Sequence, residues 1–413
     1  MPAALRFRHA PHLRAARRLA ILAGAVLSGH AAESPVVSIA AGPHERVQTL
    51  VGVTLPADLA RGPWTLIADD GQRLAMQVDD QHHGFVRILH LAAGATLTGH
   101  LAGVATAAPT VIWQRAGDVL AAHAGAQRLL RYIGGAGTLP AGVQEVYQRG
   151  GYLTDVITAA GVPVTDDYPP NHLHHHGIWM AWAKTGFAGR KPDFWNMGER
   201  TGTVQALAID GTWDGPWCAG FHARHRYLDL GVTPAVAALE ERWDVMVSAP
   251  VADAPPAIDL TATQSCSGAQ PLVLTPFHYG GLGLRGNRAW NAPDGTARFL
   301  TSAGKDRANG DETRARWCWM GGEVDGRTVG MVVCDHPANP RHPTPLRLNP
   351  KEPFLACAPS QLGEWSIQPS TPLVLRYRII AWDGAPDPAR FDRLWDDFAE
   401  PPTATVAVPS PGK

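Results

Sequence analysis

The stretch FHARHRYL, residues 221–228, alternates polar side chains with residues that suit a buried face. Successive side chains of a β-strand point to opposite faces, so this pattern is typical of a strand with one face against a core. Comparable runs occur at residues 46–53, 64–68, 73–78, 85–89, 203–209, 239–248, 272–276, 328–334 and 373–381. This density of short strands predicts an all-β protein, built as a large twisted antiparallel β-sandwich.

Turn signals separate the predicted strands, and one helix follows them. Asp69-Asp70-Gly71 joins two strands, and Asp210-Gly211 predicts a turn after residue 209. Near the C-terminus, Asp387 can cap a helix whose first position suits Pro388. The apolar face of this helix comprises Phe391, Leu394, Trp395 and Phe398, at helical spacing. We expect this face to pack on the sheet.

The composition argues against nucleic acid as a partner and indicates a large core. The chain has 36 Lys and Arg against 37 Asp and Glu, so it lacks the basic field that attracts nucleic acid. A hydrophobic fraction of 45% is enough for a large core. The 14 tryptophans are an unusually high number, and we expect most of them to fill that core, although indole faces also stack on sugar rings.

The first residues have the features of a secretory signal peptide. Arginines at positions 6, 8, 14, 17 and 18 precede the apolar residues 19–27, and small residues suit cleavage after Ala31 or Ala32. No later stretch reaches the roughly 18 apolar residues of a spanning helix. We therefore expect a periplasmic or secreted protein. The five cysteines show no zinc spacing, and one or two disulfides of open pairing are an alternative to free thiols.

We predict four regions along the chain. They are a signal peptide at 1–32, an N-terminal β region at 33–108, a main β-sandwich at 109–400 and a disordered tail at 401–413. The boundary near residue 108 follows from the small, weakly patterned residues 102–109, and the tail from the residues that follow Pro401 and Pro402.

The stretch PPNHLHHHGIWMAW, residues 169–182, carries most of the functional signal. Two prolines favour an extended or loop conformation before the histidines. In an extended chain His172, His174 and His176 would share one face and His175 the other. Three imidazoles on one face suit a divalent metal such as zinc or copper. The alternatives are acid–base or hydrogen-bonding chemistry without metal, and a loop satisfied by its neighbours.

Three further segments combine polar and aromatic residues. The loop at 191–199 contains Asp193, Trp195 and Glu199, which is typical of a small-molecule cleft and equally of a well-capped turn. Segment 275–285 offers His278 as an acid or base, with Tyr279 and Arg285 beside a glycine run that lacks a phosphate-binding pattern. Segment 335–343, with Asp335, His336 and Asn339, follows a predicted strand, where functional loops often lie.

Several of these motifs resemble those of the PmoA family. They are Gly150-Gly151-Tyr152, residues 164–172, His174-His175-His176-Gly177-Ile178-Trp179, Asp193-Phe194-Trp195, residues 279–283 and residues 336–340. The resemblance covers roughly residues 111–387. It implies an exported β-protein with a fold similar to the twisted sandwiches of sugar mutarotases and some lyases, from carbohydrate-utilising bacteria. The family's label also implies a copper-dependent oxygenase as an alternative.

Two hypotheses of different class follow. The first is an enzyme acting on a carbohydrate or glycoside by hydrolysis, elimination or epimerisation. Its candidate catalytic residues are His174, His175, His278, Glu199 and Asp335. Its candidate substrate-binding residues are Trp179, Asp193, Trp195, Tyr279, Arg285, His336 and Asn339, with Trp179 and Trp195 stacking on the ring. The second is a non-catalytic glycan- or copper-binding protein. The enzyme hypothesis requires these side chains to converge in one pocket.

Overall fold

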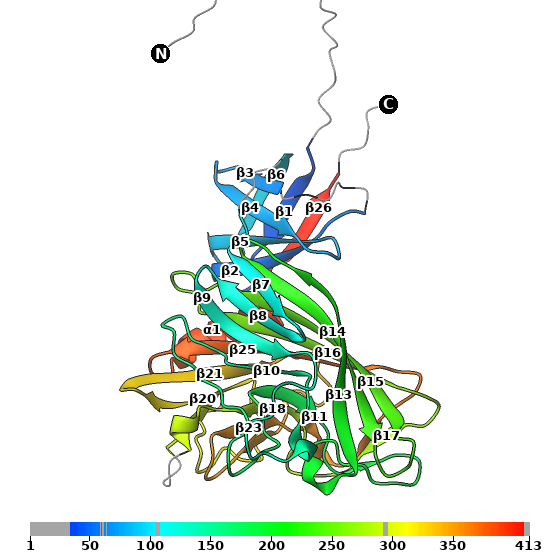
Figure 1. Cartoon of the computed structure of the whole chain (residues 1–413). Coiled ribbons are helices and arrows are strands. Elements are labelled where there is room, and N and C mark those ends of the chain that lie inside the picture. The colour runs from blue at the N-terminus through cyan, green and yellow to red at the C-terminus, as the bar shows by residue number, and fades with distance from the viewer. Residues whose placement is uncertain are drawn as a thin grey trace, which may run out of the picture.

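Antiparallel β-strands make up nearly all the regular structure in this computed structural model, which describes residues 34–57, 59, 62, 64–103, 108–291 and 296–408 (Figure 1). The expected signal peptide at 1–32 lies outside these residues. Within them the strands form four sheets, and one α-helix covers part of one sheet. The prediction of an all-β antiparallel sandwich with one C-terminal helix is confirmed.

A seven-stranded sheet forms the N-terminal part, at the top of Figure 1. In spatial order its strands are Arg46–Thr54 (β2), His83–Leu91 (β5), Arg73–Val78 (β4), Trp64–Ala68 (β3), Thr96–Gly103 (β6), Val36–Ala40 (β1) and Thr403–Ala407 (β26). Its buried side chains, among them Val37, Ile39, Val86 and Leu101, form a core of their own.

The last strand of this sheet comes from the other end of the chain. Strand β26 pairs antiparallel with β1, Val36 lying opposite Ala407. The prediction of a disordered tail at 401–413 is therefore wrong for Thr403–Ala407, whereas residues 409–413 lie outside the described part. The segment is short and only partly apolar, and its strand conformation depends on the backbone hydrogen bonds that β1 supplies.

Two eight-stranded sheets enclose the main core. The first runs in the order Leu346–Leu348 (β22), Phe354–Cys357 (β23), Gly281–Arg285 (β18), Ile178–Ala181 (β11), Tyr152–Thr154 (β10), Gln127–Ile133 (β9), Val119–Ala124 (β8) and Val111–Ala116 (β7). The second runs in the order Gly202–Trp213 (β13), Cys218–Asp229 (β14), Val236–Ser248 (β15), Ala257–Cys266 (β16), Leu373–Asp383 (β25), Arg327–Asp335 (β21), Trp317–Val324 (β20) and Arg298–Thr301 (β19).

Smaller elements complete the sandwich. A three-stranded sheet consists of Thr185–Gly186 (β12), Leu272–Leu274 (β17) and Trp365–Ile367 (β24). Short 3-10 turns lie at Glu145–Tyr147, Met197–Glu199, Arg288–Trp290 and Pro359–Leu362. The helix Pro388–Ala399 (α1) begins as predicted, because the Asp387 side chain accepts a hydrogen bond from the Arg390 N–H. Its Phe391 and Trp395 pack on Trp317 and Trp382 of the second sheet.

The period-two pattern of residues 221–228 holds in β14, which buries Phe221, Ala223, His225 and Tyr227. The turn predicted at Asp210-Gly211 is wrong. Strand β13 continues to Trp213, and the pairing with β14 shifts register between Ile209 and Gly211. A glycine within a strand often marks such a bulge.

Buried polar groups connect the two faces of the main core. Glu241 accepts hydrogen bonds from His225 Nδ1 at 2.8 Å and Gln264 Nε2 at 2.6 Å. His225 Nε2 lies 2.7 Å from the Tyr132 hydroxyl on the opposite sheet. Buried polar side chains that satisfy one another in this way tie the sheets together.

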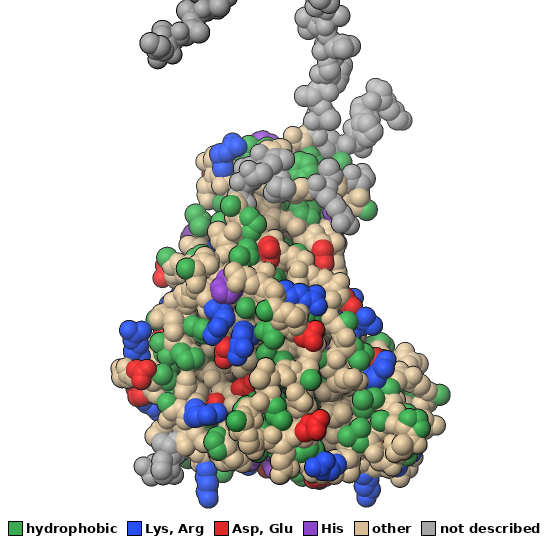
Figure 2. All heavy atoms as spheres, viewed as in Figure 1, with side chains coloured by type: hydrophobic (Ala, Val, Ile, Leu, Met, Phe, Trp, Pro, Cys, Tyr) green, Lys and Arg blue, Asp and Glu red, His purple; other side chains and the backbone are tan. Residues whose placement is uncertain are grey.

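The structure shows a surface of mixed charge and decides between the two alternatives left open for the cysteines. Figure 2 shows Lys and Arg side chains interspersed with Asp and Glu over the visible face, without a continuous basic field. All five cysteines are free, so neither of the disulfides considered above forms, and four of the five are buried. No helix in the described residues is long and apolar enough to cross a membrane.

Candidate functional site

The four histidines of residues 172–176 lie in a turn rather than in an extended segment. The His172 N–H donates to the Pro169 carbonyl, and the His175 N–H donates to the His172 carbonyl, both at 2.9 Å. The chain therefore folds back on itself, and the His172 and His175 rings stack with centroids 4.7 Å apart. The expectation that His172, His174 and His176 share one face is wrong, because alternation requires an extended backbone. The metal site predicted from these three histidines fails with it.

A carboxylate and a guanidinium complete the group around this turn. Glu352 Oε2 lies 3.0 Å from His172 Nδ1 and accepts a 2.8 Å hydrogen bond from Arg285 Nη1. The second guanidinium nitrogen, Arg285 Nη2, donates to the side-chain oxygens of Asn171 at 3.1 Å and Asn291 at 3.2 Å. We call His172, His174, His175, Arg285 and Glu352 the histidine–glutamate cluster.

One end of the first sheet brings these residues together. Arg285 is the last residue of β18, and its N–H donates to the carbonyl of Gly177, just before β11. Glu352 lies in the turn between β22 and β23, where Asn349 Oδ1 accepts a hydrogen bond from the Glu352 N–H. Since β23, β18 and β11 are neighbours, side chains from three distant segments meet at a single sheet end.

The protonation states of the cluster follow from its burial and charges. Burial, together with the neighbouring His172 and His176, lowers the pKa of His174 to about 4. Burial likewise holds the pKa of His175 well below its usual value. Burial alone would raise the pKa of Glu352, yet its contacts with His172 and Arg285 outweigh burial and lower it. At neutral pH His174 and His175 are thus neutral imidazoles beside the ionised Glu352 carboxylate.

The cluster contains one group of potential metal ligands. One ligand atom from each of His172, His175 and Glu352 lies within 4.8 Å of the other two. His172 Nδ1 has no hydrogen-bond partner in the described residues, although it is close to Glu352, so its lone pair or proton is unassigned. Arg285 opposes a cation, because its Nη1 lies 2.8 Å from Glu352 Oε2 and 3.4 Å from His175 Nδ1. The donor set fits a metal, and the adjacent guanidinium weakens the fit.

His176 is directed away from the cluster into the core. Its Nδ1 donates to Asp167 Oδ1 at 2.7 Å, and its ring stacks on Tyr152 with centroids 4.2 Å apart. Asp167 also accepts a 3.0 Å hydrogen bond from the Tyr152 hydroxyl. Nε2 of this fully buried ring has no partner among the described residues. His176 therefore lies apart from His172 and His174, the other two predicted metal ligands, and binds Asp167 instead.

Aromatic rings form a layer directly beneath the histidines. His175 lies between His172 and Phe354, 4.6 Å from the latter, and Trp179 and Trp195 pack beneath. Trp179 and Trp195 are 0% and 2% exposed, so the expectation that they stack on a sugar ring is wrong. Gly283 provides their space, because a Cβ there would lie 2.6 Å from the Trp195 ring. These indoles hold the histidine turn in place.

The loop at 191–199 borders a separate cleft of about 820 Å³. Asp193 is 2% exposed and accepts hydrogen bonds from the N–H groups of Trp195 and Asn196, as the capped-turn alternative requires. Glu199 is exposed at the rim, where Lys184 Nζ lies 3.0 Å from Glu199 Oε1 and 3.5 Å from Asp193 Oδ2. Hydrogen bonding to Glu199 raises the pKa of Lys184. The cleft therefore presents an ion pair at its rim.

A chain of ring contacts leads from the histidine turn to His278. Trp195 packs on His175 and on Tyr279, whose hydroxyl donates to Asn196 at 3.0 Å, and Tyr279 packs on His278. Burial, followed by the charge of Arg347, lowers the pKa of His278. His278 is thus separated from the histidine–glutamate cluster by Tyr279 and Trp195.

Asp335, His336 and Asn339 lie elsewhere, beside helix α1. Asp335 accepts hydrogen bonds from Asn339, His342 and the Thr344 N–H. The His336 ring contacts Phe398 of the helix. The prediction that all candidate residues converge in one pocket is therefore wrong, and the enzyme hypothesis that required it fails for the full set of residues. In the described residues the candidates form a histidine group, a cleft group and this helix-side group, so an enzyme function can rest only on the residues of one group.

The matched family model spans most of this arrangement. A family of unknown function, DUF6807, matches residues 120–396. The chain belongs to this family. The DUF6807 match includes the whole histidine–glutamate cluster, the cleft and most of helix α1, whereas β1 to β7 and β26 lie outside it. It does not address the resemblance to the PmoA family, which stays a prediction.

Other comparisons reach this DUF6807 chain only distantly. No curated protein matches it. An alpha-mannosidase from Enterococcus faecalis V583 is 7% identical with a TM-score of 0.40, covering 92% of this chain and 46% of that one. A protein of glycosyl hydrolase family 38 from Enterococcus faecalis is 9% identical with a TM-score of 0.34, covering 94% and 48%. The chain spans about half the length of both.

Glu352 and Asp167 are the site residues that the sequence analysis did not select for this DUF6807 chain. Asp167 precedes the histidine stretch by a few residues, and a carboxylate so close to four histidines was a usable signal. Glu352 lies about 180 residues from the histidines in a Pro- and Lys-containing turn, Asn349 to Pro353, which has no distinguishing pattern. Only the pairing of β23 with β18 places it beside Arg285.

Proposed function

We propose that this protein is an exported enzyme acting on a carbohydrate or glycoside by acid–base chemistry at the histidine–glutamate cluster. The observation that carries the proposal is the position of Glu352, which is fixed by Arg285 and lies 3.0 Å from His172 Nδ1. A carboxylate beside an imidazole is a recurrent arrangement for proton transfer, because its charge stabilises the imidazolium.

The accessible members of the cluster supply two complementary functions. His172, with a 34% exposed side chain, can donate a proton, because the adjacent Glu352 carboxylate stabilises its imidazolium form. His174 is neutral over the physiological range, since its pKa is about 4, and can accept a proton. Proton transfer to one sugar atom and from another is what hydrolysis, elimination and epimerisation have in common.

Polar side chains around the turn favour a substrate with many hydroxyls. Asn171 is exposed and Asn291 is partly exposed, and Arg285 fixes the side-chain oxygens of both. Amide groups of fixed orientation are suited to hydrogen bonds with sugar hydroxyls. Arg285 itself is 0% exposed, so we assign it a positioning role rather than contact with substrate.

The test is turnover of a glycan panel by untagged protein, with and without a chelator. The key variants are Glu352→Gln and His174→Asn, which we expect to reduce the rate by 10²-fold or more. The matched controls are Glu145→Gln and His100→Asn, both at exposed positions, which we expect to leave turnover unchanged. Turnover that survives chelation and is lost only in the key variants supports the proposal. Glycan binding without product indicates a binding protein instead.

A metal-binding function is the second candidate, because three donor atoms from His172, His175 and Glu352 lie within 4.8 Å of one another. Such a mixed nitrogen and oxygen set suits zinc or copper. Elemental analysis of untagged protein distinguishes the two candidates. Stoichiometric metal that is lost in Glu352→Gln, together with turnover that chelation abolishes, would indicate a metal-dependent mechanism instead of the metal-free one.

A further inference from the structure

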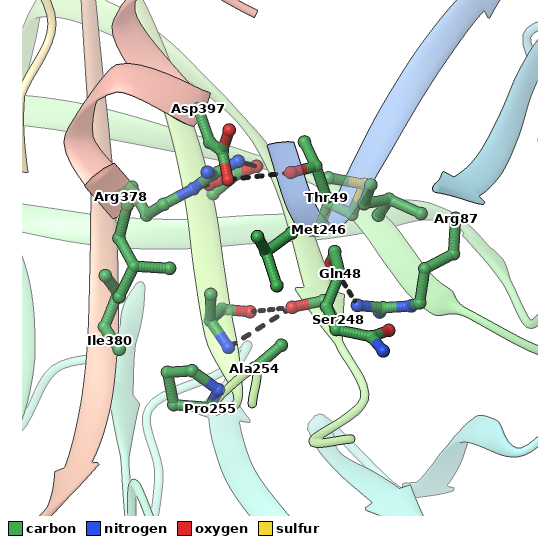
Figure 3. A pocket seen from close by; sticks show the side chains of 15 residues that line it. Gln48, Thr49, Arg87, Met246, Ser248, Ala254, Pro255, Arg378, Ile380 and Asp397 are labelled. Carbon is green, nitrogen blue, oxygen red and sulfur yellow. Dashed lines mark hydrogen bonds and ion pairs between the residues drawn. The ribbon is translucent and has the colours of Figure 1, made fainter. Parts of the chain in front are cut away.

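A small cavity between the N-terminal sheet and the sandwich contains a buried arginine that has no carboxylate partner among the described residues. Arg87 of β5 is 4% exposed, and its guanidinium points into this cavity of about 50 Å³ (Figure 3). Nη1 donates to the Gln48 carbonyl at 2.9 Å. Nε and Nη2 are buried and have no hydrogen-bond partner among the described residues.

The other charges around the cavity are already paired. Arg378 binds Asp259 through two hydrogen bonds of 2.6 Å and 2.8 Å. Asp397 accepts hydrogen bonds from Arg46 at 2.9 Å and Thr49 at 3.0 Å. Among the described residues that line the cavity, Arg87 therefore remains as an uncompensated positive charge. An unpaired charge inside a protein is costly, and native structures nearly always neutralise it.

The surrounding backbone is adapted to this guanidinium. Gln48 adopts a φ of 55°, a left-handed conformation that is uncommon for a residue other than glycine. It lies between the paired positions Val47 and Thr49 of β2, and its carbonyl is the one that Arg87 contacts. Such local strain is maintained where surrounding contacts require it. The Trp217 ring, 5.7 Å from the guanidinium carbon, covers another side.

We infer that this cavity binds a small monovalent inorganic anion, of the size of chloride or bromide, through Nε and Nη2 of Arg87. The anion neutralises Arg87 and joins the two parts of the molecule, since β5 belongs to the N-terminal sheet and the facing Met246 and Ser248 belong to β15. The volume admits one such ion or a few water molecules and excludes larger anions. The two lining carboxylates do not oppose it strongly, because each already has an arginine.

The first test is thermal unfolding of the full chain at constant ionic strength, with gluconate replaced stepwise by chloride or bromide. Ligand that binds only the folded state raises the unfolding midpoint in a saturable manner. We expect a rise of several degrees for chloride and bromide, and no rise in Arg87→Met. The control Arg115→Gln, at an exposed arginine, should keep the full rise. Two results would overturn the inference: a rise that persists in Arg87→Met, or an unfolding midpoint of the unaltered protein that stays the same when chloride or bromide replaces gluconate.

A second measurement does not depend on the folding of the variant. Crystals of the unaltered protein grown or soaked in bromide are measured at the bromine absorption edge. An anomalous peak within hydrogen-bonding distance of Arg87 Nε and Nη2 supports the inference. Ordered water alone at that position, with bromide elsewhere on the surface, overturns it.

Discussion

Glu352 Oε2 accepts a hydrogen bond from Arg285 Nη1 and lies 3.0 Å from His172 Nδ1. Arg285 is completely buried and also donates to Asn171 and Asn291, so a single guanidinium fixes one carboxylate and two amides. The arrangement of the proposed site therefore depends on a residue that does not itself reach solvent.

Replacement of Arg285 by methionine should destabilise the protein by about 3–5 kcal/mol, because it leaves a partly buried carboxylate without its cation. Chemical denaturation measures this loss. Glu352→Gln should cost only about 1–2 kcal/mol, since an amide can still accept from Arg285. If Arg285→Met proves no less stable than Glu352→Gln, Arg285 does not have the positioning role described above.

Acidification should destabilise the protein through His174 and His175. Both have pKa values lowered in the folded state, to about 4 for His174, so the unfolded chain binds more protons between about pH 6.5 and 4. Stability therefore rises with pH across this window and falls as pH drops through it. Unfolding midpoints at several pH values measure the slope, which should be shallower in His174→Asn than in His100→Asn. Equal slopes would show that His174 does not titrate in this way.

The β-architecture was predictable because period-two alternation reports directly on which face of a strand is buried. Residues 221–228 and the helix after Asp387 behave as their patterns indicate. The prediction of a turn at Asp210-Gly211 failed because the same two residues also suit a β-bulge. Only the pairing of β13 with β14 decides between a turn and a bulge. The strand at Thr403–Ala407 was missed because its partner, β1, lies at the opposite end of the chain.

The candidate site was predictable only in part. The histidine stretch was recognisable as a polar group next to a buried strand, but its face assignments assumed an extended backbone. Hydrogen bonds from the His172 and His175 N–H groups form a turn instead. The turn places His175 in the histidine–glutamate cluster and directs His176 into the core. Trp179 and Trp195 belong to the core, and no local feature distinguishes an indole that packs there from one that binds a sugar.

Gly177 should not tolerate a side chain. A Cβ at this position would lie 2.4 Å from the Leu153 carbonyl oxygen and 2.9 Å from the Thr154 Cα, and both are backbone atoms that cannot rotate away. Gly177→Ala should therefore separate β10 from β11 and cost roughly 1–3 kcal/mol. Gly52→Ala is the control, because nothing lies within 4 Å of its Cβ position. Comparable unfolding midpoints for the two variants would contradict the close packing.

Glu241 and Glu240 are adjacent on β15 and should respond differently to substitution. Glu241→Ala leaves the buried donors of His225 and Gln264 unpaired and should cost about 3–5 kcal/mol. Glu240→Ala removes only a surface ion pair with Arg226, so a change within about 0.5 kcal/mol is expected. Denaturant titration of both variants measures the difference, and a small effect of Glu241→Ala would mean that water or rearrangement satisfies these donors.

Removal of the C-terminal strand should open the N-terminal sheet while the sandwich stays folded. A chain that ends at Pro402 lacks β26, so one side of β1 loses its backbone partners from Val36 to Ala40. Val37 and Ile39, both fully buried, would then lie on an exposed edge strand. Hydrogen exchange in Val36–Ala40 should accelerate by at least tenfold, and proteolysis should cleave first within the N-terminal sheet. A chain that ends at Val408 keeps β26 and should match the full-length protein. Unchanged exchange in the shorter chain would show that β6 alone holds β1 in place.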